Sequence, residues 1–136
     1  MAEYVTQSEE LRRMGTRLIK TRKLLEYLRD TDVVIGYCYS DQLKKNGEKL
    51  VLGECIKVKP VYQAFMPYDF IIVFYSVNTD CLTKHQKEIL MIHELLHIGV
   101  SNSGNLTYKI NQHDIEDFRS LISRYGIDWA GDQYGT

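Results

Sequence analysis

FIIVFY at residues 70–75 and KHQKEILMIHELLHIG at residues 84–99 decide the fold of this chain. The first segment is a continuous apolar run flanked by turn residues, a pattern typical of a strand that is buried on both faces. The second segment is apolar almost all round from Ile89 to Ile98, which is typical of a helix at the centre of a fold. A buried strand followed by a buried helix therefore forms the expected core.

The ends of this helix can be predicted from local signals. Thr83 and Gln86 have the spacing of a capping box, in which each side chain satisfies a backbone N–H group of the other residue. Gly99 suits a left-handed terminator, because glycine adopts positive φ without steric cost. We therefore expect the helix to run from Lys84 to Ile98.

The remaining chain predicts further helices and strands around this core. Apolar residues recur at three- and four-residue steps near the N-terminus, and shorter β-branched or alternating runs follow. The expected elements are a helix over 8–29 capped by Ser8 or by Thr6 with Glu9, strands over 33–39 and 50–58, a turn at 45–48, a loop over 101–105, an extended segment over 106–110, and a last helix from about Asp114. Together they predict an α+β fold in a single domain over residues 1–136.

Composition and charge narrow the class of protein. The chain has 136 residues, 44% of them hydrophobic and 26% charged, with a formal net charge of −1. This balance predicts no bulk attraction to nucleic acid or to an anionic membrane, and no apolar run is long enough to span a bilayer. Cys38, Cys55 and Cys81 are odd in number and widely spaced, which argues against a disulfide framework or a zinc ribbon. With no secretory leader in the sequence, we expect a cytoplasmic protein.

One face of the N-terminal helix is basic. Two interpretations fit it: a solvated helix surface, which we favour, or a contact surface for nucleic acid. Acidic residues are interspersed in the same helix, which supports the first. The basic side chains are those of Arg12, Arg13, Arg17, Lys20, Arg22 and Lys23.

The helix over 84–98 carries the motif His93-Glu94-Leu95-Leu96-His97. Four residues turn an α-helix by about 400° and advance it by about 6 Å, so both imidazoles project from one face. Two neutral imidazoles in this arrangement can bind one Zn²⁺ ion. Glu94 lies to the side, where its carboxylate can act as general base on a water activated by the metal. The motif therefore predicts a zinc peptidase.

A catalytic zinc site needs a third protein ligand, which local spacing does not identify. No histidine follows His97 within ten residues, so the metzincin extension is absent. We expect His113 to be the ligand, because imidazole is the commonest zinc ligand, and Glu116 is the alternative. The acidic residues beside them, Asp114 and Asp117, would orient the imidazoles. His85 is too far from His93 to share the metal, and we expect it to be exposed.

These residues resemble the putative phage metallopeptidase family. The resemblance rests on HELLHIG at 93–99, HDIEDF at 113–118, YGIDW at 125–129, the apolar strand at 70–75 and the lead-in KHQK at 84–87. A more distant similarity is to the SprT-like metallopeptidases, which also pair H-E-x-x-H with a later histidine. It implies that His113 is the third ligand. Residues 78–81, NTDC, depart from relatives that carry a tryptophan there.

The resemblance implies a zincin-like fold in which a small mixed sheet packs with an N-terminal helix, a zinc-binding helix and a C-terminal helix. In such folds the substrate commonly binds as an added strand at the sheet edge. We therefore expect Zn²⁺ as cofactor, a protein or peptide substrate, no membrane partner, and a location in the host cytoplasm if the chain is phage-encoded. The sequence predicts no oligomeric state.

Two other functions are compatible with the sequence. One is a zinc-stabilised binding protein without catalysis, which contacts nucleic acid through the basic helix face. The other is metal-assisted hydrolysis of a non-peptide amide. Glu94 separates the first from an enzyme, because a purely structural zinc site does not need a base beside the metal. The sequence identifies no residue that would stabilise the oxyanion.

Overall fold

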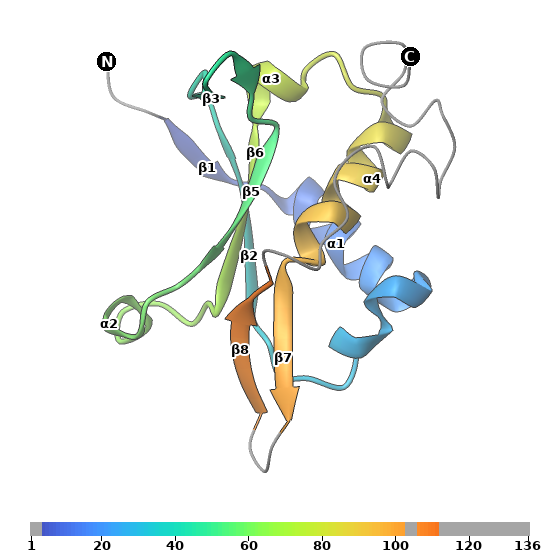
Figure 1. The fold of residues 1–136 in the computed structure, drawn as a ribbon, viewed down its shortest axis with the longest axis vertical. Coiled ribbons are helices and arrows are strands. Elements are labelled where there is room, and N and C mark those ends of the chain that lie inside the picture. Colours follow the sequence, from blue (N-terminus) through green and yellow to red (C-terminus); the bar gives the residue numbers. More distant parts are fainter. Residues whose placement is uncertain (1–3, 103–105, 112–136) are drawn as a thin grey trace.

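The computed structural model describes residues 4–102 and 106–111. Within them the fold is mixed α+β, as predicted, and helices α1 and α4 lie on one face of the main sheet (Figure 1). Among the described residues, no helix has the length and apolar character needed to cross a membrane. The elements are β1 (Val5–Gln7), α1 (Glu9–Thr21), the 3₁₀ helix η1 (Lys23–Leu28), β2 (Ile35–Ser40), β3 (Lys45–Asn46), β4 (Lys49–Leu50), β5 (Gly53–Lys57), α2 (Pro60–Gln63), β6 (Phe70–Tyr75), α3 (Ser76–Thr79), α4 (Lys84–Leu95), β7 (Ile98–Asn102) and β8 (Leu106–Ile110).

The main sheet has the strand order β1-β2-β6-β5. Strand β6 has the predicted bounds and an internal position, parallel to β2 and antiparallel to β5. Its alternate side chains are buried on both faces, with Phe70 and Phe74 towards the helices and Val73 on the opposite face. Because β6 is internal, β5 forms one edge of the sheet.

The N-terminal helix is shorter than predicted. It begins after Ser8, whose hydroxyl accepts the Leu11 N–H, so Ser8 alone is the cap. It ends at Thr21, and Arg22 is extended before η1 begins. The guanidinium of Arg29 donates to two carbonyls near this break, so the end of the helix is satisfied by a residue that lies distant in sequence.

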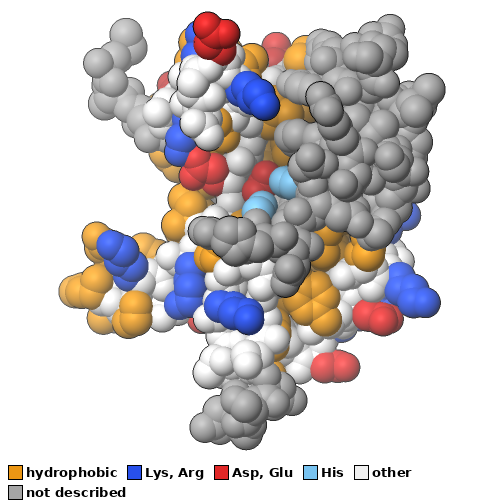
Figure 2. Space-filling view, viewed as in Figure 1, with side chains coloured by type: hydrophobic (Ala, Val, Ile, Leu, Met, Phe, Trp, Pro, Cys, Tyr) orange, Lys and Arg blue, Asp and Glu red, His pale blue; other side chains and the backbone are white. Residues whose placement is uncertain are grey.

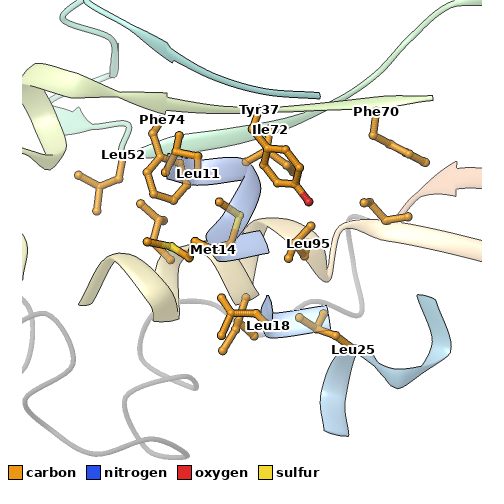
Figure 3. Packing of buried hydrophobic residues seen from close by; sticks show 14 of the residues in the cluster. Leu11, Met14, Leu18, Leu25, Tyr37, Leu52, Phe70, Ile72, Phe74 and Leu95 are labelled. Carbon is orange, nitrogen blue, oxygen red and sulfur yellow. The ribbon is translucent and has the colours of Figure 1, made fainter. Parts of the chain in front are cut away.

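The core lies between the sheet and the two long helices (Figure 3). Leu11 and Leu18 from α1, Ile72 and Phe74 from β6, and Leu95 from α4 are all 0% exposed. Burial of each such side chain contributes on the order of 1.5–3 kcal/mol. Helix α4 is therefore fixed against both α1 and the sheet.

The end of α4 was predicted wrongly. The helix stops at Leu95, three residues early, and Gly99 lies within strand β7. Gly99 is not a left-handed terminator, because Gly47 is the residue with positive φ among the described ones. Gly47 is at the tip of the β3–β4 hairpin, where the sequence predicts a turn.

The other boundaries differ less from the predictions. Strands β2 and β5 fall within or close to the predicted ranges, and β8 has the predicted bounds. Strand β7 extends through Asn102, so the first two residues of the predicted 101–105 loop are in a strand. The helix predicted from Asp114 lies outside the described residues.

Candidate metal centre

The helix that carries the motif begins with the predicted capping box. The Thr83 hydroxyl accepts the Gln86 N–H at 3.1 Å, and the Gln86 side chain accepts the Thr83 N–H at 2.7 Å. From Ile89 to Ile92 every side chain is buried. The start and the core-facing part of α4 are thus fixed before the chain reaches the candidate ligands.

His93 and Glu94 lie in the last turn of α4, and His97 follows its end. The N–H of His97 donates to the carbonyl of Glu94 at 3.1 Å, so the chain continues with a tightened turn. The rings of His93 and His97 consequently remain neighbours, with centroids 5.3 Å apart and planes at 88°. Both side chains are partly exposed. The predicted convergence of two imidazoles therefore holds, although one of them lies outside the helix.

The ring of His97 is oriented by a backbone carbonyl. Its Nδ1 lies 2.7 Å from the carbonyl oxygen of Asn111. A carbonyl oxygen only accepts hydrogen bonds, so Nδ1 carries the proton and Nε2 of the neutral ring has the free lone pair. This tautomer is the one that a zinc-binding histidine with such a partner adopts. Nε2 lies 3.9 Å from Oε1 of Glu94, next to the acid of the motif.

Glu94 is a buried acid. Its side chain is 4% exposed, and burial raises its pKa to about 8, with a smaller contribution from the negative charge of Glu54. Removal of a carboxylate from water is costly unless a cation or hydrogen bonds compensate. A bound cation beside Glu94 would restore the charged form and lower this pKa.

These side chains line a pocket of about 340 Å³. Figure 2 shows histidine side chains beside acidic ones on this face of the molecule. Edge strand β5 forms one wall, and at Gly53 a Cβ atom would lie 3.4 Å from Oε2 of Glu94. The lining residues are Leu50, Val51, Leu52, Gly53, Glu54, Cys55, His93, Glu94, His97 and Ile110.

The donor set fits zinc as far as the structure describes it. Two neutral imidazoles with one ring held by a carbonyl are typical zinc ligands. Within residues 4–102 and 106–111, no three His, Cys, Asp or Glu side chains converge to hold a metal. The predicted third ligand, His113, and its alternative, Glu116, lie outside these residues. The same holds for the neighbouring acids Asp114 and Asp117.

Two residues of the site were not predicted from the sequence. Gly53 gives space beside Glu94, and its only signal is a glycine inside a strand pattern, which often marks close approach. Asn111 holds His97 through main-chain atoms, for which the sequence has no signal. The prediction that His85 is exposed is confirmed.

None of the three cysteines forms a disulfide. Cys38 is buried in β2, and Cys55 is partly exposed in β5, where both were predicted to lie in strands. Cys55 lines the pocket, and burial raises the pKa of its thiol well above the usual range. Among the described residues, Cys55 does not join His93 and His97 in a group of three that could hold a metal.

Comparison with known families identifies the chain. Residues 3–133 match the family described as putative phage metallopeptidase, and this range includes the motif histidines, Glu94 and His113. Comparisons with curated proteins and with solved structures gave no significant match. The family description names a metal-dependent peptidase and agrees with the resemblance seen in the sequence. This chain belongs to the putative phage metallopeptidase family.

Proposed function

We propose that this protein is a zinc-dependent peptidase with a single zincin-like domain. His93, His97 and His113 would hold the zinc ion, and Glu94 would be the general base. The observation that supports it most is the orientation of His97: its Nδ1 donates to a carbonyl, and its Nε2 lies 3.9 Å from Oε1 of the buried Glu94. A carboxyl group and two imidazoles in one pocket suit metal-assisted hydrolysis.

The choice of His113 is supported by the length of the chain. Asn111 is bonded to His97 through both its N–H and its carbonyl group, each at 2.7 Å. Two residues of chain span at most about 7 Å, so the backbone of His113 stays within that distance of the Asn111 backbone. Glu116 is five residues from Asn111 and has no comparable restriction.

In this proposal Glu94 transfers a proton twice. Zinc bound by the histidines would polarise the scissile carbonyl and make water a stronger acid. The carboxylate of Glu94 accepts a proton from the attacking water, whose oxygen bonds to the carbonyl carbon. As the C–N bond breaks, Glu94 returns that proton to the leaving amine nitrogen. The low exposure of Glu94 keeps bulk water from competing for the proton.

The edge of the sheet suits an extended peptide substrate. The carbonyl of Leu52 accepts from Tyr75 N–H, and the N–H of Val58 donates to Asp69, so even-numbered residues of β5 bond to β6. Hydrogen bonding alternates along an antiparallel strand, so the odd-numbered residues from Gly53 onward present their N–H and C=O groups at the free edge. Among the described residues no strand pairs with this edge. A peptide added there would pass the wall of the pocket.

The rival function as a nucleic-acid-binding protein has less support. Arg12 and Arg13 both contact Glu9, and Arg17 pairs with Glu88 of α4. These ion pairs reduce the positive charge that the basic helix face offers to phosphate groups. A solvated surface remains our interpretation of this face.

The proposal predicts about one zinc ion per chain and zinc-dependent cleavage of an unfolded protein such as casein. A chelator should abolish cleavage, and stoichiometric zinc should restore it. A His97→Ala variant should lose both zinc and activity. Elemental analysis that finds no bound transition metal, with no uptake on titration, would refute the proposal.

A further inference from the structure

The β7–β8 hairpin returns the chain to the end of α4. Strand β7 begins directly after His97, and β8 pairs with it antiparallel, with Ile98 opposite Ile110. The pairing continues by one more pair beyond Ile98 and Ile110, because the N–H of Asn111 donates to the carbonyl of His97 at 2.7 Å. Asn111 therefore lies opposite His97, at the open end of the hairpin.

Asn111 contacts both the main chain and the ring of His97. Its N–H fixes the His97 backbone, and its carbonyl accepts from Nδ1 of the ring, also at 2.7 Å. Two bonds from one residue restrict the ring relative to its own backbone. A side chain in the turn after a helix would otherwise have several rotamers available. The pair of bonds selects one ring orientation and one tautomer.

Gly99 makes this close approach possible. A Cβ atom at position 99 would lie 2.6 Å from Oδ1 of Asn111 and 2.8 Å from Cγ of Lys109. Real Cβ atoms do not approach other atoms so closely, so any other residue at position 99 would force the side chains of Asn111 and Lys109 to shift. The φ angle of Gly99 is not positive, so the glycine is required for space and not for backbone conformation.

We propose that Asn111, packed on Gly99, is a positioning residue that holds His97 with Nε2 directed to the metal. The proposal rests on the zinc site described above and extends it to a residue that touches neither metal nor substrate. A carbonyl that accepts from a ligating imidazole fixes the tautomer and raises the basicity of the other nitrogen. Loss of such partners typically costs 10–100-fold in metal affinity.

The steric contact allows a test by substitution and rescue. Gly99→Ala should push Asn111 away and weaken zinc binding by about 10-fold or more, measured by competition with a chromophoric chelator. Asn111→Ala keeps both main-chain bonds and should change the affinity by less than about 3-fold. The Gly99→Ala/Asn111→Ala double variant removes the clash with Oδ1, while the exposed Lys109 can rotate away. It should bind zinc as well as Asn111→Ala alone.

Gly36→Ala is the matched control. Gly36 lies on strand β2, away from the site, and a Cβ atom there would also meet a side chain, the ring of Tyr68, at 3.2 Å. This variant should lose stability without losing zinc affinity. Wild-type affinity in folded Gly99→Ala, or a double variant as weak as Gly99→Ala, would overturn the positioning role. Wild-type protein that binds no zinc would instead refute the zinc site itself.

Hydrogen exchange tests the same role in unmodified protein, should Gly99→Ala not fold. If zinc fixes His97, zinc binding should slow hydrogen exchange at the N–H of Asn111. It should slow exchange less at the reference N–H of Val58, which donates to the carbonyl of Asp69 at the end of the β5–β6 pair. Equal slowing of both amides would mean that zinc only stabilises the fold as a whole, and would contradict the proposal.

Discussion

Glu94 and Gly53 lie next to each other in the lining of the pocket. A Cβ atom at position 53 would be 3.4 Å from both Cγ and Oε2 of Glu94, and 3.0 Å from the carbonyl oxygen of Val73. The first two distances are ordinary van der Waals contacts, but the third is tighter than most real Cβ contacts, so the backbone there would have to shift by a few tenths of an ångström. At position 53 the edge strand therefore leaves little more room beside the candidate base than one Cβ atom would fill.

Substitution of Gly53 should impair turnover more than zinc binding. Gly53→Ala should shift β5 relative to β6 by a few tenths of an ångström, and Gly53→Val adds methyl groups beside the Glu94 carboxylate. Displacement of a reacting group by about 1 Å can cost 10²-fold, so kcat/KM should fall in the order wild type, Ala, Val. The measurement is cleavage of one protein substrate at equal zinc occupancy. Full activity in the Val variant would show that β5 does not shape the site.

The sequence predicts those elements whose signals are local. The run at 70–75 is continuous and apolar, so both ends of β6 are correct, and the Thr83–Gln86 capping box gives the start of α4. The end of α4 has no such signal, because the residues through Ile98 continue the apolar pattern. Contacts distant in sequence are found there instead: Tyr27 donates its hydroxyl to the carbonyl of Ile98 at 2.6 Å, and Asn111 bonds to His97.

Short strands were missed for a related reason. β1 has three residues, and β3 and β4 have two each, which is too few for an alternating pattern to be recognised. The motif predicts that His93, Glu94 and His97 lie close together, and the tightened turn after α4 keeps His97 beside the other two. Gly53 and Asn111 join the site through pairing of strands and hairpins, and a sequence read locally cannot place them.

Titration of Glu94 should appear in the stability of the metal-free protein. Its pKa is raised from the ordinary value of 4.5 to about 8 in the fold. Between these values the folded chain retains a proton that the unfolded chain has released, so the free energy of unfolding falls as pH rises. Glu94→Gln cannot titrate and should avoid this loss.

The advantage of Glu94→Gln over wild type should therefore grow from about pH 5 to about pH 8 and remain constant above that. Denaturant unfolding of both proteins, with chelator present, measures the difference at each pH. A difference that does not change with pH would mean that Glu94 is charged in the metal-free fold.

The third ligand can be identified by two substitutions. His113→Ala should weaken zinc binding strongly, because it removes one of three protein ligands. Glu116→Ala should bind zinc nearly as well as wild type. Chelator competition on both variants gives the comparison, and a reversed result would assign the ligand to Glu116.

The central claim is that Glu94 is the general base of a zinc peptidase. Glu94→Gln keeps the shape of the side chain and leaves both imidazoles in place, so zinc content and fold should be retained. Turnover should fall by at least about 10²–10⁴-fold, the usual contribution of a positioned base. The most direct measurement is the rate of cleavage of one protein substrate by wild type and Glu94→Gln at matched zinc occupancy. A large loss with zinc retained is the predicted result, and equal rates would contradict the account.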